Sequence, residues 1–253
     1  MKSCVITGGY NGLGLSLARK LAKAGYGVVI SGRDEAKLAR ALEQLKGAGA
    51  NATAIKVDVT KVRECKKLVD HCINTYGSLD LMVNNAGVLE DGVKPKLVDR
   101  IVDTNLKGVE YCSYYALERM KKQKEGGMLV NISSTSGVNI KANAAGEAIY
   151  ASSKFGVTAY SGYLFKEHRD SKIRVLCFCP GGTKTDLFRN DPSRLLPDFM
   201  DPDAAAGVLA RQIIEGQTGL MVLERKGLLK HDREFSPSWN WATEQTINFS
   251  EFK

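Results

Sequence analysis

The segment Ser3–Gly14, SCVITGGYNGLG, constrains the fold most strongly because an apolar run leads directly into a glycine-rich turn. The run Cys4–Ile6 has the composition of a buried strand, and apolar residues at helical spacing follow the turn. Glycines allow a sharp bend and let phosphate oxygens approach the amides of a helix N-terminus, where the helix dipole favours anions. The segment therefore predicts a strand, a pyrophosphate-binding turn and a helix. The same pattern also fits a tight connection that holds no ligand.

Apolar runs alternate with helical stretches of ten or more residues along the rest of the chain. Connections of that length favour right-handed βαβ crossovers and hence a parallel sheet covered on both faces. We expect a single α/β domain over residues 1–253, a doubly wound fold of the Rossmann type with a seven-stranded, mainly parallel sheet and helices on both faces. The expected strands are 4–6, 27–33, 52–59, 79–87 with its turn, 127–133, 173–180 and 219–224, and the expected helices are 15–25, 35–48, 61–76, 96–124, 149–168 and 202–215.

Composition excludes several classes of protein. With 43% hydrophobic and 25% charged residues the chain is typical of globular proteins, and no apolar run approaches the roughly 20 residues of a membrane span. The net charge of +8 is spread along the chain, so we expect no nucleic-acid partner. Because the first strand starts almost at once, we expect no signal peptide and a cytoplasmic protein. The six cysteines fall in expected strands and helices as small buried side chains, and neither disulfides nor a metal site is indicated.

Small and polar residues gather where the expected strands end. In doubly wound sheets, ligands bind beyond the carboxyl ends of the strands, near the point where the strand order reverses. The segments at these ends are 8–14, 32–33, 58, 84–87, 133–134 and 180–185. We therefore expect these segments to form one site.

Tyr150 and Lys154 are four residues apart at the start of an expected helix, so they project from the same face. A free tyrosine has a pKa near 10, but a nearby ammonium favours the phenolate and lowers that pKa toward the range in which proton transfer is efficient. The pair is therefore a candidate acid/base site. In isolation it also fits a surface tyrosine lying over a lysine stem.

Motifs in a fixed order resemble those of one family. TGGYNGLG at 7–14, NNAG at 84–87, NISS at 131–134, YASSK at 150–154 and PGGTKT at 180–185 are similar to motifs of the short-chain dehydrogenases/reductases, over residues 2 to about 224. The resemblance implies a nicotinamide-dependent oxidoreductase with Tyr150 as the catalytic acid/base. It implies that Lys154 binds the nicotinamide ribose and lowers the pKa of the tyrosine, that Ser134 hydrogen-bonds the substrate oxygen, and that Asn105 holds a water in the proton relay.

The same resemblance implies which residues contact the cofactor. It places Asp58 and Val59 near the adenine, residues 85–87 along the adenosine, and residues 181–185 near the nicotinamide. The full expected set is Thr7, Gly8, Tyr10, Asn11, Gly12, Leu13, Gly14, Ser31, Gly32, Arg33, Asp58, Val59, Asn85, Ala86, Gly87, Tyr150, Lys154, Pro180, Gly181, Thr183 and Thr185. Thr183 or Thr185 could instead cap the turn after the sixth strand.

Two of the implied roles have alternatives. Ser134 lies 16 residues before Tyr150, which indicates a small insertion at 139–148, so Ser133 or Ser136 could take the role of Ser134. Asn105 could instead join two backbone segments without contacting any ligand.

The end of the second strand, Ser31-Gly32-Arg33, indicates the cofactor. A carboxylate there would bind the adenosine ribose hydroxyls and repel a 2′-phosphate, whereas an arginine accepts that phosphate in charge-assisted hydrogen bonds. Gly32 stands where similar NAD-binding sequences carry Asp, so we expect NADP(H). Asp34 should cap the following helix and so face away from the phosphate. The alternative for Arg33 is a solvated surface charge.

Substrate choice is expected to lie in the loop 135–148, in the segment 186–200 and in the tail 225–253, which departs from the family. The segment 186–200 fits a mobile flap over an apolar substrate or a surface loop with its own small core. The tail should pack on its own subunit, on a neighbour or over the site, because it contains Trp239, Trp241, Phe249 and Phe252.

Two helices with the tyrosines 111, 114, 115, 160 and 163 resemble the pair through which related proteins form dimers and tetramers, so we expect a homodimer or homotetramer.

The sequence thus favours an NADPH-dependent carbonyl reductase acting on a small-molecule ketone. The alternatives are an NAD-linked alcohol dehydrogenase of the same family and a non-catalytic NADP(H)-binding protein that regulates or acts as a scaffold.

Overall fold

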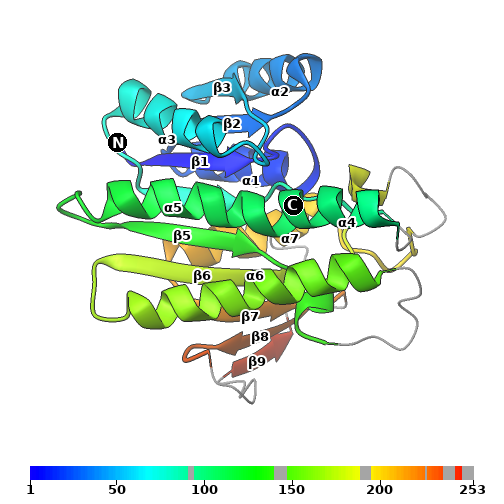
Figure 1. The fold of residues 1–253 in the computed structure, drawn as a ribbon. Coiled ribbons are helices and arrows are strands. Elements are labelled where there is room, and N and C mark those ends of the chain that lie inside the picture. The colour runs from blue at the N-terminus through cyan, green and yellow to red at the C-terminus, as the bar shows by residue number, and fades with distance from the viewer. Residues whose placement is uncertain (91–93, 140–146, 189–194, 226, 236–242, 247–253) are drawn as a thin grey trace.

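A nine-stranded sheet forms the centre of the protein, in the order β3-β2-β1-β4-β5-β6-β7-β8-β9 (Figure 1). The computed structural model describes residues 1–90, 94–139, 147–188, 195–225, 227–235 and 243–246. Strands β1 to β7 run parallel, and β8 and β9 are antiparallel to their neighbours. The strands are β1 (Ser3–Thr7), β2 (Gly27–Gly32), β3 (Ala52–Lys56), β4 (Leu81–Asn84), β5 (Gly127–Ile132), β6 (Ile173–Pro180), β7 (Gly219–Leu223), β8 (Leu228–Asp232) and β9 (Thr243–Thr246).

Alternate strand residues pack against helices on opposite faces of the sheet. In β1, Cys4 and Ile6 belong to one hydrophobic cluster and Val5 to another, because successive side chains of a strand point to opposite faces. The first cluster packs against α1 (Gly12–Lys23), α2 (Glu35–Gly47) and α7 (Pro202–Ile214). The second packs against α3 (Val62–Tyr76), α5 (Gly108–Met120) and α6 (Ala148–Glu167), which lie in front of the sheet in Figure 1. This is the doubly wound α/β fold that the sequence predicts, and all six cysteines are buried as expected.

The predicted count of seven strands is wrong, because the tail adds two more. After β7 the chain turns at Gly227, whose φ is +81°, and returns as β8. Strand β9 then pairs with β8, so these parts of the tail pack on the chain's own sheet. The aromatic residues Trp239, Trp241, Phe249 and Phe252 lie outside the described residues.

The predicted helix over 96–124 is also wrong as a continuous α-helix. The chain forms α4 (Pro95–Val102), a π-helical turn at Asp103–Lys107 and then α5. Asn105 lies in the π turn and is fully buried. A π turn inside an α-helix is frequently found at a functional site. None of the described helices is long and apolar enough to cross a membrane.

The strand order reverses between β1 and β4, and buried polar side chains tie the strands beyond this point to their helices. Asn84 donates to Ser113 Oγ at 2.9 Å and to Asn131 Oδ1 at 2.8 Å, and Asn131 donates to Ser161 Oγ at 2.9 Å. All four side chains are buried, so each bond offsets the loss of water. The chain of bonds joins α5, β4, β5 and α6 below the ends of the strands.

We expect Asn131→Ala to lower the free energy of unfolding by about 2–3 kcal/mol, because it leaves a buried Asn84 N–H without its acceptor, removes the bond that Ser161 Oγ accepts and opens a cavity. Urea unfolding followed by circular dichroism measures the change. The exposed Ser152→Ala on α6 is the control and should shift the value by less than about 0.5 kcal/mol. A similar small shift for Asn131→Ala would show that the buried chain of amides contributes little.

Candidate functional site

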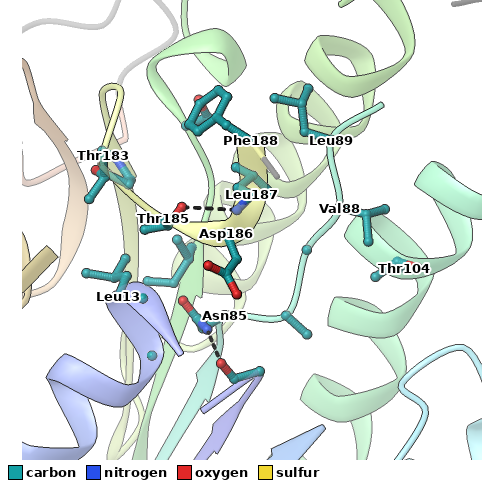
Figure 2. A pocket seen from close by; sticks show the side chains of 18 of the residues that line it. Leu13, Asn85, Val88, Leu89, Thr104, Thr183, Thr185, Asp186, Leu187 and Phe188 are labelled. Carbon is teal, nitrogen blue, oxygen red and sulfur yellow. Dashed lines mark hydrogen bonds between the residues drawn. The ribbon is translucent and has the colours of Figure 1, made fainter. Parts of the chain in front are cut away.

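A cavity of about 560 Å³ opens at the carboxyl ends of the parallel strands (Figure 2). Loops after β1, β2, β3, β4, β5, β6 and β7 all contribute lining residues, as the strand-end pattern predicts. Of the residues expected to act in catalysis or cofactor binding, all line this cavity except Thr7 and Asn105.

The turn between β1 and α1 requires glycine at two positions, because the φ angles of Gly8 and Gly12 are +63° and +49°. The first amides of α1 have no acceptor within the helix and lie at its N-terminus, where an anion is favoured. Asn85 holds the turn in place, since its Nδ2 donates to Thr7 O at 2.9 Å and to Gly8 O at 3.2 Å. The turn therefore presents a rigid, anion-attracting edge to the cavity.

Thr7 is a positioning residue in this structure. Its Oγ1 accepts hydrogen bonds from the backbone N–H of Asn85 and of Ala86, each at 3.0 Å. The side chain is buried beneath the cavity, so it joins the end of β1 to the loop after β4.

Tyr150 and Lys154 lie at the start of α6 and are both buried. Lys154 Nζ donates to Ile132 O at 2.8 Å and lies 5.9 Å from the centre of the Tyr150 ring. Both side chains line the cavity, which rules out a surface tyrosine over a lysine stem.

The pKa of the tyrosine differs from the sequence-based expectation. Burial raises the pKa of Tyr150 to about 12, and a hydrogen bond with Ser134 offsets only part of that rise. Burial also lowers the pKa of Lys154 to about 8, since the surroundings disfavour the ammonium. Desolvation is thus the largest cause of the pKa shift in both groups, and the phenol keeps its proton at neutral pH.

Ser134 is the serine that contacts Tyr150. Its Oγ also accepts from Ser136 N at 3.1 Å, which fixes the short helical turn Thr135–Gly137. Ser133 Oγ instead donates to Lys154 O at 2.9 Å and lies 2.8 Å from Thr158 Oγ1, so it serves packing. The geometry favours Ser134 over Ser133 for contact with a substrate oxygen. Residues 140–146 of the expected insertion lie outside the described residues.

The side chain of Asn105 joins two segments of the protein. Its Oδ1 accepts from Val88 N at 2.8 Å, and its Nδ2 donates to Val88 O at 2.9 Å and to Ser153 Oγ at 3.1 Å. Both amide hydrogens are therefore in use within the protein. The alternative of a joining residue accounts for this side chain, and a role in a proton relay stays a prediction.

At the end of β2 the cavity is lined by Ser31, Gly32 and Arg33. Ser31 Oγ is fully buried and has no hydrogen-bond partner among the described residues. Arg33 is exposed, and Asp34 caps α2 by accepting from Lys37 N at 3.0 Å, as predicted. Asp58 Oδ1 accepts from Thr60 N at 3.0 Å, which fixes the loop after β3. The orphan hydroxyl and the guanidinium are the groups that this end offers to an anionic ligand.

Part of the cavity has an apolar wall, which the sequence predicts only roughly. The rings of Phe188 and Phe199 lie 5.2 Å apart, and Leu187 and Leu196 join them in the lining. The segment 186–200 therefore contributes four apolar side chains to the cavity, and residues 189–194 lie outside the described residues. Figure 2 shows Leu187 and Phe188 above the glycine turn.

The sequence reasoning missed two arginines that line the cavity, Arg225 and Arg100. Arg225 bonds Asp198 Oδ1 at 3.1 Å and lies 5.4 Å from the Phe199 ring centre, and Arg100 bonds Glu90 Oε1 at 2.7 Å. Arg225 follows the carboxyl end of β7, so the rule that located the other loops could have found it. Arg100 has no such signal, because it lies within α4.

The two threonines after β6 have local partners. Thr183 Oγ1 donates to Gly181 O at 3.1 Å, and Thr185 Oγ1 accepts from Leu187 N at 3.4 Å (Figure 2). Asp186 binds Asn11 Nδ2 at 2.9 Å and thereby joins this loop to the glycine turn. Both threonines therefore stabilise the loop, whether or not they also contact a ligand.

Comparison with known proteins gives consistent matches. The family model described as short chain dehydrogenase matches residues 2–195. The chain is 33% identical over 191 residues to a 3-oxoacyl-(acyl-carrier-protein) reductase of Staphylococcus aureus, covering 74% of this chain and 76% of the relative. It is 33% identical over 195 residues to a diacetyl reductase of Staphylococcus epidermidis, covering 74% and 73%. A solved structure of a variant actinorhodin polyketide ketoreductase with NADPH has a TM-score of 0.80 and 29% identity, covering 88% of this chain and 95% of that one.

Lys154→Met should raise the melting temperature at pH 7, because the buried ammonium costs the folded state about 3 kcal/mol when its pKa falls from 10.5 to about 8. The lost hydrogen bond to Ile132 O offsets about 1 kcal/mol of that gain. Between pH 8 and 10.5 the unfolded lysine binds more protons than the folded one, so the wild type gains stability as pH rises.

The difference in melting temperature between the two proteins should therefore shrink as the pH approaches 10. Scanning calorimetry across this range checks it, with the exposed Lys122→Met as a control that changes little at any pH. A difference that does not vary with pH would contradict a buried ammonium.

Proposed function

Since the chain belongs to the short-chain dehydrogenase/reductase family and is an oxidoreductase of that kind, we propose that it is an NADPH-dependent carbonyl reductase. The observation that carries the proposal is the contact of the Tyr150 phenol with Ser134, with the Lys154 ammonium beside its ring, in the same cavity as the glycine turn. Relatives named as reductases of 3-oxoacyl chains and of diacetyl support reduction of a ketone.

The residues of the cavity fit a phosphorylated dinucleotide. The glycine turn offers helix-end amides to a pyrophosphate. Ser31 Oγ, an orphan hydroxyl, and the Arg33 guanidinium suit a phosphate on the adenosine ribose. Such a cofactor, when bound, supplies a hydride from C4 of its nicotinamide. NADP(H) is therefore our proposal, and an NAD-linked alcohol dehydrogenase is the alternative.

The catalytic side chains would act on the carbonyl oxygen. Ser134 and Tyr150 donate hydrogen bonds to that oxygen and polarise the carbonyl. As the oxygen gains negative charge, Tyr150 transfers its proton to it, and the phenol holds that proton at neutral pH because its pKa is about 12. Lys154, cationic below its pKa of about 8, stabilises the phenolate that remains.

A non-catalytic regulator or scaffold is the second candidate, and one observation disfavours it. A buried, charged Lys154 lowers the stability of the folded protein, and a protein without chemistry at this site would gain nothing from keeping that charge.

We also propose a homodimer or homotetramer through α5 and α6, because Tyr114 and Tyr163 are 57% and 78% exposed there. Sedimentation that shows only monomer at micromolar concentration would oppose this assembly.

Tyr150→Phe should lower kcat for ketone reduction at least about 100-fold, since it removes the proton donor while keeping the ring. NADPH oxidation over a panel of ketones measures the rate, and calorimetry should show NADPH binding little changed. Tyr163→Phe on the exposed face of the same helix is the matched control. Turnover by Tyr150→Phe at the rate of the control would remove the tyrosine from the mechanism, and binding without turnover by the wild type on every ketone would favour the regulator.

Arg33→Ala should weaken NADPH binding about tenfold or more and leave NADH binding nearly unchanged, because only the phosphorylated cofactor has a charge for the guanidinium to meet. Dissociation constants of both cofactors measure the effect. Arg40→Ala, which removes an exposed arginine from α2, is the control. Equal losses for the two cofactors would show that Arg33 does not bind the phosphate of NADPH.

A further inference from the structure

Gly32, the last residue of β2, is a glycine for steric reasons. It is buried and is not among the described glycines with positive φ, so its backbone conformation is open to any residue. A Cβ placed on Gly32 would nevertheless overlap Cε1 and Cδ1 of Tyr10, and the three nearest atoms all belong to that ring. The tyrosine is therefore what excludes a side chain at this position.

Tyr10 comes from the glycine turn and packs, partly buried, against the core on the α1 side of the sheet. Its ring crosses from β1 to the end of β2 and closes the space above Gly32. Both residues line the cavity. A carboxylate that could accept the hydroxyls of an adenosine ribose would have to begin in the space that this ring occupies.

The acidic groups near the ring are occupied elsewhere. Asp34 caps α2, and Glu35 pairs with Lys56 at 3.1 Å. Asp58 accepts from Thr60, and Asp186 binds Asn11. The end of β2 thus offers a ligand the orphan hydroxyl of Ser31 and the guanidinium of Arg33, which suit a phosphate better than a pair of hydroxyls.

We propose that Tyr10 is a specificity-determining residue of the nucleotide site: by filling the space above Gly32 it selects a ribose that carries a phosphate over one with a free hydroxyl pair. This inference rests on the proposed binding of NADP(H). It assigns the discrimination to an interlocked pair, Tyr10 with Gly32, in addition to the charge of Arg33.

The test is a double-mutant cycle of Tyr10→Ser and Gly32→Asp. Dissociation constants of NADP⁺ and NAD⁺ are measured by calorimetry, and melting temperatures are measured without nucleotide. Gly32→Asp alone should lower the melting temperature and weaken both nucleotides, because the new side chain meets the ring. With Tyr10→Ser added, the melting temperature should recover and NAD⁺ should bind at least about tenfold more tightly than NADP⁺.

Gly47→Asp is the matched control, because a Cβ at Gly47 meets nothing within 4 Å. It adds the same carboxylate and should leave both constants and the melting temperature nearly unchanged. If neither protein with Gly32→Asp folds, Gly32→Ala decides: alone it should lower the melting temperature and weaken both nucleotides, and adding Tyr10→Ser should restore both.

Additive effects of the two substitutions, or a full switch to NAD⁺ by Gly32→Asp alone, would overturn the proposal. So would a wild type that binds neither nucleotide. If the proposed reductase activity is wrong, the protein binds nucleotide but turns over no ketone. The dissociation constants of the double-mutant cycle can still be measured in that case.

Discussion

The hydrogen bonds between the end of β1 and the loop after β4 hold the two halves of the site together. Thr7 Oγ1 accepts two backbone amides of that loop, and Asn85 returns two bonds to the glycine turn. Because these strands are neighbours at the reversal of strand order, the same bonds fix the spacing between the anion-attracting turn and the loop after β4. A site for nucleotide and chemistry depends on that fixed spacing more than on any single lining residue.

Burial in this site acts on two groups in opposite directions. The phenol of Tyr150 becomes a weaker acid and the ammonium of Lys154 becomes a stronger one, so each group is driven toward its neutral form. Both desolvated groups lie at the start of α6, and Asn105 in the nearby π turn also departs from regular α-helical geometry. Strain and desolvation concentrated in one place are typical of a site at which proton transfer occurs.

Much of this arrangement could be predicted from sequence, because strand ends in a parallel sheet converge whatever their detailed bounds. Local sequence patterns can be read without the fold, and they include the glycine turn, Arg33 after β2 and the Tyr150–Lys154 spacing. Three features depend on contacts that no local pattern contains. Asn105 in the π turn bonds Val88, burial raises the pKa of Tyr150, and β8 and β9 pair along an edge that only the assembled sheet provides.

The antiparallel pair beyond β7 also has a consequence for the surface of the sheet. Without β8, the backbone N–H and C=O groups along one side of Gly219–Leu223 would be bare, and such a row readily pairs with another chain. Strands β8 and β9 therefore cover the edge of β7, the apolar strand that leads to Arg225 at the cavity. Chains shortened after β7 would consequently be prone to aggregate through that edge even with every residue of the cavity in place.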